Sequence, residues 1–293
     1  MRLVWFPTWL CQNYNIQNPQ ERSLRCPYCP YGYDNGLIFN GQQTCGPQSF
    51  IDPKIMVTFL KTNRVYLGEQ IEFSGGEPLL YPYLIDVLSS LPEFRWAITS
   101  NTSVVSTVKR LDESGILGKC GSWTASYHLL SNRDKEFASS VEILQKNNIK
   151  IPTTIVIAEE TIEHIPRALT FLKKIGIQKI QCHIDAHRNV DITELTNRIT
   201  ALAPEVRIQY NAVHRTNVTC RINKELLAIS PEGDIFPCVT ILYGCHDIKN
   251  PERIPICRVS EHLDLKHDLP NKVEKCNLDC TAPCDFCKHV TYE

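Results

Sequence analysis

A chain of 293 residues with 43% hydrophobic and 22% charged side chains has the composition of an ordinary globular protein, which excludes a disordered or collagen-like chain. The 31 basic and 32 acidic side chains give a formal net charge of −1, so we expect no general nucleic-acid-binding surface. The apolar run 3–11 is too short to span a bilayer and no cleavage site follows it, so we expect a cytoplasmic protein without a membrane anchor.

Short segments that are apolar or rich in β-branched residues predict strands at 2–6, 70–73, 96–99, 122–127, 153–158 and 179–184. Apolar residues at one-face helical spacing predict helices at 133–147 and 162–175, and Gly176 supplies a helix end. This alternation indicates a parallel sheet with functional residues at the carboxyl ends of its strands. Because a complete barrel needs eight such units, we expect an α/β fold with a partial (β/α)6 barrel over residues 1–205.

The pattern changes after residue 205. Segments 225–229 and 234–236 flank Ser230-Pro-Glu-Gly233, which predicts a hairpin around a Pro/Gly turn. Cysteine-rich loops follow to the end of the chain. This part has too few apolar residues for a sizeable core, so we expect residues 206–293 to form a small hairpin and loop domain that folds around metal.

The 14 cysteines are unevenly distributed, with three near the start and eight in the last quarter. A reducing cytoplasm disfavours disulfides, so metal binding or thiol catalysis is the better interpretation. The first group can hold an iron–sulfur cluster while leaving one iron without a protein ligand. A zinc site or a redox dithiol would fit its last two members equally well. The first group is Cys11, Cys26 and Cys29.

The motif Phe73-Ser-Gly-Gly-Glu-Pro78 follows a predicted strand. Gly75 and Gly76 permit close backbone approach to a ligand, and Glu77 can accept a hydrogen bond from an ammonium group. An ordinary Gly-Gly-x-Pro turn is the alternative.

Together, the three-cysteine loop, the Gly-Gly-Glu-Pro loop and the six-unit order resemble the radical S-adenosylmethionine (radical SAM) superfamily over roughly residues 1–200. The chain departs from the usual pattern in the long gap between Cys11 and Cys26. Certain 7-carboxy-7-deazaguanine synthases have a comparably long insertion, so the departure affects the subfamily more than the cluster.

The resemblance implies an enzyme that binds SAM to the open iron of a [4Fe–4S] cluster, cleaves it reductively, and abstracts a hydrogen atom from the substrate. An electron donor such as flavodoxin or ferredoxin would supply the electron. By the same resemblance, Gly75, Gly76 and Glu77, with Pro78, hold the methionine amine. Tyr28 packs near the adenine. Ser100 and Asn101 are candidates for the ribose, with turn or helix-cap residues as the equal alternative.

The last quarter extends the resemblance. Cys220-x12-Gly233-x4-Cys238 has the opening pattern of SPASM and twitch extensions, and Cys284 and Cys287 would complete an auxiliary [4Fe–4S] cluster. We favour one such cluster over two. Further cysteines are candidates for a second one: Cys245, Cys257, Cys276 and Cys280. A structural zinc site is the alternative, on Cys276, Cys280, Cys284 and Cys287.

Other polar residues end predicted strands. Tyr127 and His128 lie at the end of the fourth, and His183, Asp185 and His187 at the end of the sixth. Each group could bind polar groups of a substrate or move protons, although a hydrogen-bonded polar cap is the favoured interpretation. Cys245, after a glycine, is a candidate hydrogen donor to a substrate radical, although a cluster ligand or an inert thiol is favoured over that role.

Three function classes follow. The first is a radical SAM enzyme, an oxidoreductase or epimerase, that oxidises, epimerises or rearranges a small molecule such as a sugar, cyclitol or modified metabolite. The alternative is a maturase of a ribosomally made peptide. Because the first predicted strand begins at Arg2, we expect no leader-peptide module, which favours the first class. The least favoured is a non-enzymatic zinc or iron–sulfur binding module.

Overall fold

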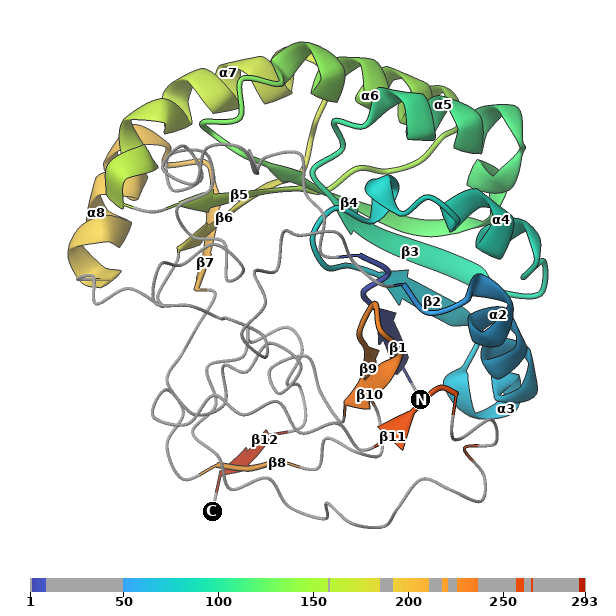
Figure 1. Ribbon diagram of the computed structural model, residues 1–293. Helices are drawn as coiled ribbons and strands as arrows, with labels where there is room; N and C mark the ends of the chain where they lie inside the picture. Colours follow the sequence, from blue (N-terminus) through green and yellow to red (C-terminus); the bar gives the residue numbers. More distant parts are fainter. Residues whose placement is uncertain are drawn as a thin grey trace, which may run out of the picture.

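Figure 1 shows the computed structural model, which describes residues 2–8, 50–157, 159–184, 192–210, 218–220, 226–236, 257–260, 265 and 290–292. The strands within these residues are β1 (Arg2–Trp5), β2 (Gln70–Phe73), β3 (Arg95–Ser100), β4 (Cys120–Tyr127), β5 (Thr153–Ile157), β6 (Ile180–Ile184), β7 (Arg207–Tyr210), β8 (Val218–Cys220), β9 (Leu226–Ile229), β10 (Asp234–Phe236), β11 (Cys257–Arg258) and β12 (Val290–Tyr292).

Helices lie on the convex side of the curved sheet (Figure 1). Asp52 begins the first of them by accepting a hydrogen bond from the N–H of Lys54 over 2.8 Å, and Gly176, with φ +82°, follows the end of α7 as expected. The α-helices are α2 (Pro53–Thr62), α3 (Arg64–Leu67), α4 (Leu84–Ser89), α5 (Val105–Glu113), α6 (Asp134–Lys146), α7 (Ile165–Lys174) and α8 (Ile192–Leu202). Short 3-10 helices are η1 (Pro78–Leu80), η2 (Ile116–Lys119) and η3 (Glu159–His164).

Ten of the described strands form one sheet in the order β11-β10-β9-β1-β2-β3-β4-β5-β6-β7. Strands β1 to β7 are parallel to their neighbours throughout. Because β11 and β7 are the two edges of this sheet, the barrel is open, and the predicted α/β fold with a partial barrel is confirmed. The carboxyl ends of the parallel strands meet at one edge, where functional side chains are expected.

The predicted elements differ from the observed ones mainly at their ends. Each of the six predicted strands is present, with bounds that differ by at most two residues where they are described. The predicted helix at 162–175 begins instead as η3 and becomes α-helical at Ile165, directly before Pro166. Strand β7 was not expected from the sequence, because its four residues RIQY are too short to show a clear period.

The two faces of the sheet have different characters. On the convex face, Leu3, Ile71 and Trp123 join one hydrophobic cluster with residues of the covering helices. Side chains alternate along a strand, so Thr99 and Thr124, which are paired neighbours on β3 and β4, lie on the concave face. Thr99 is exposed. Complete barrels fill this face with bulky apolar residues, so the small hydroxyl side chains here leave an accessible polar wall.

The predicted hairpin is present and continues the main sheet. Strands β9 and β10 pair antiparallel, and β9 pairs parallel with β1. Gly233 in the turn has φ +88°, and a Cβ built on it would lie 2.6 Å from Cδ1 of Ile51. The N–H of Ile51 donates to the carbonyl oxygen of Pro231 over 2.8 Å. The turn therefore packs directly against the segment that precedes α2.

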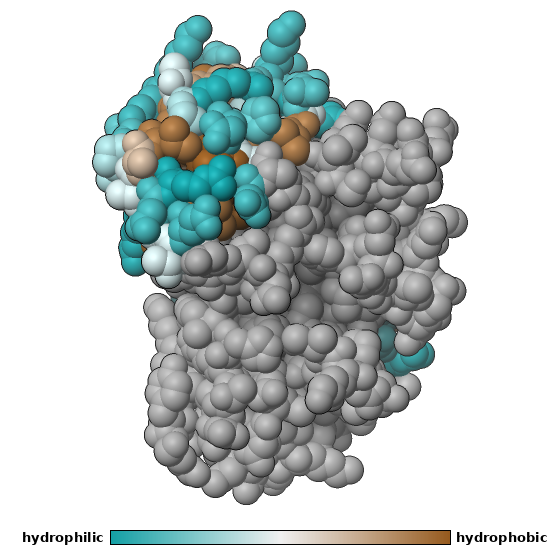
Figure 2. All heavy atoms as spheres, turned by 90° about the vertical axis from the view of Figure 1, so that its left-hand side faces the viewer, coloured by the Kyte–Doolittle hydropathy of each residue, from teal (hydrophilic) through white to brown (hydrophobic). Residues whose placement is uncertain are grey.

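Among the described residues on the side of the molecule that carries α8, hydrophilic side chains lie next to a smaller hydrophobic area (Figure 2). None of the helices in the described part of the chain combines the length and hydropathy needed to cross a bilayer.

Candidate functional site

The candidate site begins where the first two parallel strands end. Directly after β2, the N–H of Ser74 donates to the carbonyl oxygen of Trp5 over 3.0 Å. Two residues later, the N–H of Gly76 donates to the carbonyl oxygen of Thr8 over 3.1 Å. The Gly-Gly-Glu-Pro loop therefore lies against the segment that leads from β1 toward Cys11 in the sequence.

Gly75 is required here by backbone conformation and by space. Its φ of +116° lies in a region that residues with a side chain rarely adopt. A Cβ built on Gly75 would lie 2.9 Å from the carbonyl oxygen of Thr8 and 3.1 Å from Cδ1 of Phe6. A side chain would therefore push the two loops apart. In this structure the first glycine serves the packing of protein backbone on protein backbone, while its approach to a ligand stays a prediction.

The carboxylate of Glu77 is fully buried and joins two loops. Its Oε1 accepts hydrogen bonds from the N–H of Leu79 over 3.0 Å and from Oγ of Ser100 over 2.8 Å. Its Oε2 accepts one from the N–H of Asn101 over 2.7 Å. Pro78 follows as the first residue of η1, for which Glu77 is the N-terminal cap. The loop after β2 is thereby bonded to the end of β3.

Burial raises the pKa of Glu77 from 4.5 to about 7, because removal from water penalises the charged form. The hydrogen bonds from Leu79, Asn101 and Ser100 oppose this effect by stabilising the carboxylate. A nearby ammonium group would stabilise it further. Near neutral pH, Glu77 therefore exchanges between its charged and neutral forms.

The turn after β3 is held by its own polar side chains. Oγ of Ser100 accepts a hydrogen bond from the N–H of Thr102 over 2.8 Å. Oδ1 of Asn101 accepts two from Ser103, one from its N–H over 3.1 Å and one from its Oγ over 2.7 Å. Thr102 has φ +60°, which is unusual for a β-branched residue. Nε1 of Trp123 donates to Oγ1 of Thr102 over 3.0 Å, which ties the turn to β4.

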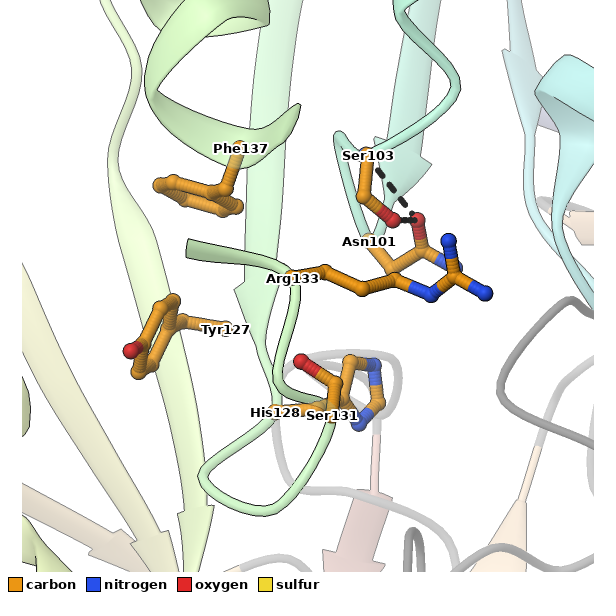
Figure 3. A pocket seen from close by; sticks show the side chains of 7 residues that line it. All are labelled: Asn101, Ser103, Tyr127, His128, Ser131, Arg133 and Phe137. Carbon is orange, nitrogen blue, oxygen red and sulfur yellow. Dashed lines mark hydrogen bonds between the residues drawn. The ribbon is translucent and has the colours of Figure 1, made fainter. Parts of the chain in front are cut away.

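A pocket opens beside this turn, at the carboxyl ends of β3 and β4 (Figure 3). In Figure 3, Arg133 reaches across the pocket toward Asn101, and His128 and Ser131 lie below it. The pocket is small and open to solvent, so it suits at most one small polar group of a larger ligand. The lining residues are Asn101, Ser103, Tyr127, His128, Ser131, Arg133 and Phe137.

Two basic side chains, those of His128 and Arg133, line this pocket. Desolvation lowers the pKa of His128 from 6.5 to about 4, so its imidazole is neutral at neutral pH. A neutral imidazole can donate one hydrogen bond and accept another. Arg133 contributes a planar guanidinium with five N–H donors. Arg133 directly precedes Asp134, the first residue of α6. A pocket of this kind can bind a carboxylate or several hydroxyl groups.

Asp134 fixes the start of α6 and hence the position of Arg133. Its Oδ1 accepts a hydrogen bond from the hydroxyl of Tyr127 over 2.6 Å, and its Oδ2 pairs with Arg167 of α7 over 2.6 Å. Burial raises the pKa of Tyr127, so its hydroxyl stays a donor. The backbone that carries Arg133 is thereby anchored to β4 and α7.

The structure brings together several of the residues singled out from the sequence, namely Gly75, Gly76, Glu77, Pro78, Ser100 and Asn101. Tyr127 and His128 line the adjacent pocket. His183 lies on β6, farther along the sheet. Cys220 ends β8, and Cys257 is buried at the start of β11. The remaining predicted site residues lie outside the described residues: Cys11, Cys26, Tyr28, Cys29, Asp185, His187, Cys238, Cys245, Cys276, Cys280, Cys284 and Cys287.

Sequence reasoning missed Ser103, Ser131, Arg133 and Phe137 as pocket residues. One signal was present. Arg133 is the first residue of the helix predicted at 133–147 and follows the end of a predicted strand by six residues, a position from which a side chain can reach the carboxyl edge of a parallel sheet.

No family model matches the sequence, and no curated protein matches it. The fold is similar to that of Streptococcus suis SuiB bound to S-adenosylmethionine, with a TM-score of 0.59 and 16% identity over 92% of this chain and 66% of that chain. SuiB bound to the precursor peptide SuiA gives a TM-score of 0.60 and 16% identity over 92% of this chain and 65% of that one. The structure of anSMEcpe with bound AdoMet gives 0.59 and 12% identity, over 92% and 78%. This chain thus spans about two thirds of SuiB, and similarity at these identities establishes a shared fold.

Proposed function

We propose that this chain, which has the fold of the radical SAM enzymes, is itself an enzyme that uses an iron–sulfur cluster and SAM to react with its substrate by radical chemistry. One observation carries the proposal. The hydrogen bond from Gly76 to Thr8 places the Gly-Gly-Glu-Pro loop three residues of chain from Cys11. Three residues span at most about 11 Å, which supports assigning the two motifs that resemble the family to one site.

The cluster would be held by Cys11, Cys26 and Cys29. When bound, the cluster and SAM supply one-electron chemistry, while the chain binds and orients them. We assign the SAM ammonium to Gly75, Gly76 and Glu77, next to Pro78. The donor set of the neighbouring pocket fits the rest of the amino acid group, because the forked guanidinium of Arg133 matches a carboxylate.

The ribose assignment now rests on the pocket rather than on Ser100. Oγ of Ser100 donates to Glu77 and accepts from Thr102, so this hydroxyl is engaged within the protein. Asn101 also makes hydrogen bonds within the protein, since its Oδ1 accepts two from Ser103, but its side chain lines the pocket. We therefore assign Asn101 to the ribose hydroxyls, and Tyr28 stays the candidate for the adenine.

We propose that Cys220, Cys238, Cys284 and Cys287 hold an auxiliary [4Fe–4S] cluster. Support comes from the pairing of β8 with β12, which puts Cys220 opposite Val290. Cys287 precedes Val290 by three residues, at most about 11 Å of chain. This pairing supports assigning the first and last of the four cysteines to one cluster.

A second auxiliary cluster would need Cys257, Cys276 and Cys280. Cys257 pairs with Ile235 on β10 and is part of the hydrophobic core cluster. Such surroundings disfavour a charged thiolate, which supports one auxiliary cluster over two.

For the substrate, we propose a small polar molecule such as a sugar, cyclitol or modified metabolite. The hydroxyl side chains of Thr99 and Thr124 on the concave face suit hydrogen bonds to its hydroxyl groups. A peptide is the second candidate, because the similar protein SuiB has been solved with its precursor peptide. Flavodoxin or ferredoxin would supply the electron, and oxidation, epimerisation and rearrangement stay open as outcomes.

The deciding experiment measures iron, sulfide and SAM cleavage in anaerobically reconstituted protein. We expect about eight irons for two four-iron clusters, or about twelve for three. Replacing Cys11, Cys26 and Cys29 with Ala should remove about four irons and abolish the formation of 5′-deoxyadenosine with dithionite. The matched control replaces Cys120 and Cys182, which lie on β4 and β6, and should change neither. Cleavage by the triple variant would refute the proposal, and zinc without sulfide would support a binding module.

Two further measurements address the substrate. Deuterium transfer from a candidate substrate into 5′-deoxyadenosine would identify the attacked position, and binding of a leader peptide would favour the peptide alternative. With a substrate in hand, Cys245→Ala tests Cys245 as the hydrogen donor. A donor variant should still form 5′-deoxyadenosine and lose an epimerised product at constant iron content, whereas a fall in iron would make Cys245 a ligand.

A further inference from the structure

We propose that Glu77 is a positioning residue that shapes the pocket before any ligand binds, by fastening the turn after β3 to the loop after β2. The proposal deepens the proposed function where it concerns SAM, but the positioning itself belongs to the protein alone. Direct contact with the SAM ammonium and positioning are separable roles, because only the second predicts an effect in SAM-free protein.

The carboxylate of Glu77 makes most of its hydrogen bonds to the other loop. Two of its three hydrogen bonds come from residues 23 and 24 positions away, on the other loop. The donors are Oγ of Ser100 and the N–H of Asn101. Because the side chain of Glu77 is 0% exposed, these bonds form away from water and stabilise the contact between the loops strongly.

The hydrogen bonds continue beyond Glu77 and Ser100. Oγ of Ser100 also accepts a hydrogen bond from the N–H of Thr102 over 2.8 Å. Oγ1 of Thr102 in turn accepts one from Nε1 of Trp123 over 3.0 Å. One chain of bonds therefore runs from Glu77 through the turn after β3 to the middle of β4.

These hydrogen bonds maintain an unusual backbone conformation at Thr102. A φ of +60° at Thr102 is unfavourable for a β-branched residue and persists only where the surroundings determine it. Its N–H and its hydroxyl are both held by the chain of bonds that starts at Glu77. Loss of the carboxylate should let this backbone relax toward a commoner conformation.

Asn101 connects Glu77 to the pocket. Its main-chain N–H is bonded to Glu77, and its side chain lines the pocket with Ser103 and Arg133 (Figure 3). A turn that relaxes at Thr102 moves Asn101 and Ser103 on either side of it. Glu77 thus acts on ligand binding through Asn101, without lining the pocket itself.

The test uses the full-length, reconstituted, SAM-free protein and the indole N–H NMR signals of isotope-labelled tryptophan. Glu77→Gln keeps the size of the side chain but replaces one acceptor oxygen with an NH₂ donor, which cannot accept from Ser100 or Asn101. We expect the signal of Trp123 to shift while that of Trp5, outside this chain of bonds, stays in place. Glu72→Gln is the matched control, since Glu72 lies on β2 but pairs with Arg2 over 2.5 Å; it should leave both signals unchanged.

Calorimetry of SAM binding then connects the shift to function. Glu77→Gln should weaken SAM affinity about tenfold or more, the loss expected for a hydrogen bond to a charged group. Ser100→Ala removes the bond to Glu77 and also the acceptor for the N–H of Thr102, so it should shift the Trp123 signal at least as much. It leaves the bond between Glu77 and Asn101 in place, so it should weaken SAM affinity less. In the double variant the two effects should not add.

An unchanged Trp123 signal in Glu77→Gln overturns the positioning role, whatever happens to SAM affinity. A shifted signal in a protein whose wild type binds no SAM leaves the positioning role standing and refutes the proposed function. If Glu77→Gln does not fold, Ser100→Ala decides alone, because an unchanged Trp123 signal there contradicts the chain of bonds.

Discussion

The N–H of Gly76 donates a hydrogen bond to the carbonyl oxygen of Thr8 over 3.1 Å, and this contact joins two loops that lie almost seventy residues apart in the sequence. Thr8 is fully buried. Because main-chain groups make the contact, its geometry is set by backbone conformation, and Gly75 provides the unusual φ that permits it. Changes in the glycine loop should therefore be felt in the segment that leads to Cys11.

Gly75→Ala tests this coupling. The added Cβ would lie 2.9 Å from the carbonyl oxygen of Thr8, and alanine at this φ is itself strained. We expect the free energy of unfolding to fall by about 1–3 kcal/mol, as measured by urea denaturation. Iron content after reconstitution should fall too, because the strain is applied close to the first cysteine.

Gly118→Ala is the control for that substitution. Within the described part of the chain, and apart from its chain neighbours and the backbone of its own helix η2, no atom lies within 4 Å of a Cβ built on Gly118. Its free energy of unfolding should change by no more than about 0.5 kcal/mol. Equal stability of the Gly75 and Gly118 variants would contradict the steric argument.

The raised pKa of Glu77 predicts a pH dependence of stability. Since the pKa rises from 4.5 to about 7 on folding, the folded protein binds the proton more tightly than the unfolded chain does. The free energy of unfolding contributed by this group is therefore largest below pH 4.5 and falls as the pH rises to about 7, by on the order of 3 kcal/mol. Urea denaturation of wild type and Glu77→Gln should show a difference in stability that decreases across this interval.

Ser100→Ala sharpens the pH test. The hydrogen bond from Ser100 lowers the pKa of Glu77, so its removal should extend the decrease in stability to higher pH. SAM binding should do the opposite if its ammonium contacts the carboxylate, and near pH 7 it should release a proton from Glu77. Calorimetry in buffers of different ionisation enthalpy measures that proton, and an uptake would count against the contact.

Arg133→Met tests the carboxylate assignment in the pocket. Loss of the guanidinium should weaken SAM affinity about 10- to 100-fold at unchanged iron content, since hydrogen bonds between charged groups contribute about 1.5–3 kcal/mol. Arg133→Lys keeps the charge but loses the fork and should be intermediate. Lys135→Met removes an exposed cation two residues away that does not line the pocket, and it should leave the affinity unchanged.

Gly233→Ala tests how the hairpin is attached to the sheet. Its Cβ would lie 2.6 Å from Cδ1 of Ile51, and φ +88° adds backbone strain. We expect the free energy of unfolding to fall by about 1–3 kcal/mol. Ile51→Val removes the crowded atom, so the double variant should lose less stability than the sum of the single ones. Strict additivity would show that the turn does not pack on Ile51.

The α/β alternation, the open barrel and the hairpin at residues 226–236 could be predicted from the sequence, because period and turn chemistry are local properties. Strand β7 could not, since four residues show too little period and its pairing with β6 depends on the finished sheet. The Gly-Gly-Glu-Pro loop could also be located from the sequence, because a glycine pair after a predicted strand is a local signal.

The sequence by itself determined which residue types stand at the carboxyl ends of the strands, and that order already indicates a parallel sheet with its chemistry at one edge. Only the tertiary structure decided what each does there. Glu77 was predicted from the sequence to accept a hydrogen bond from a ligand, and the structure adds that its buried carboxylate accepts hydrogen bonds from Ser100 and Asn101. Arg133 was not predicted from the sequence as a site residue, yet it lines the pocket. The physical reason is that strand packing brings distant loops within hydrogen-bonding distance, and neither the partners nor the burial of a polar side chain is encoded in its near neighbours.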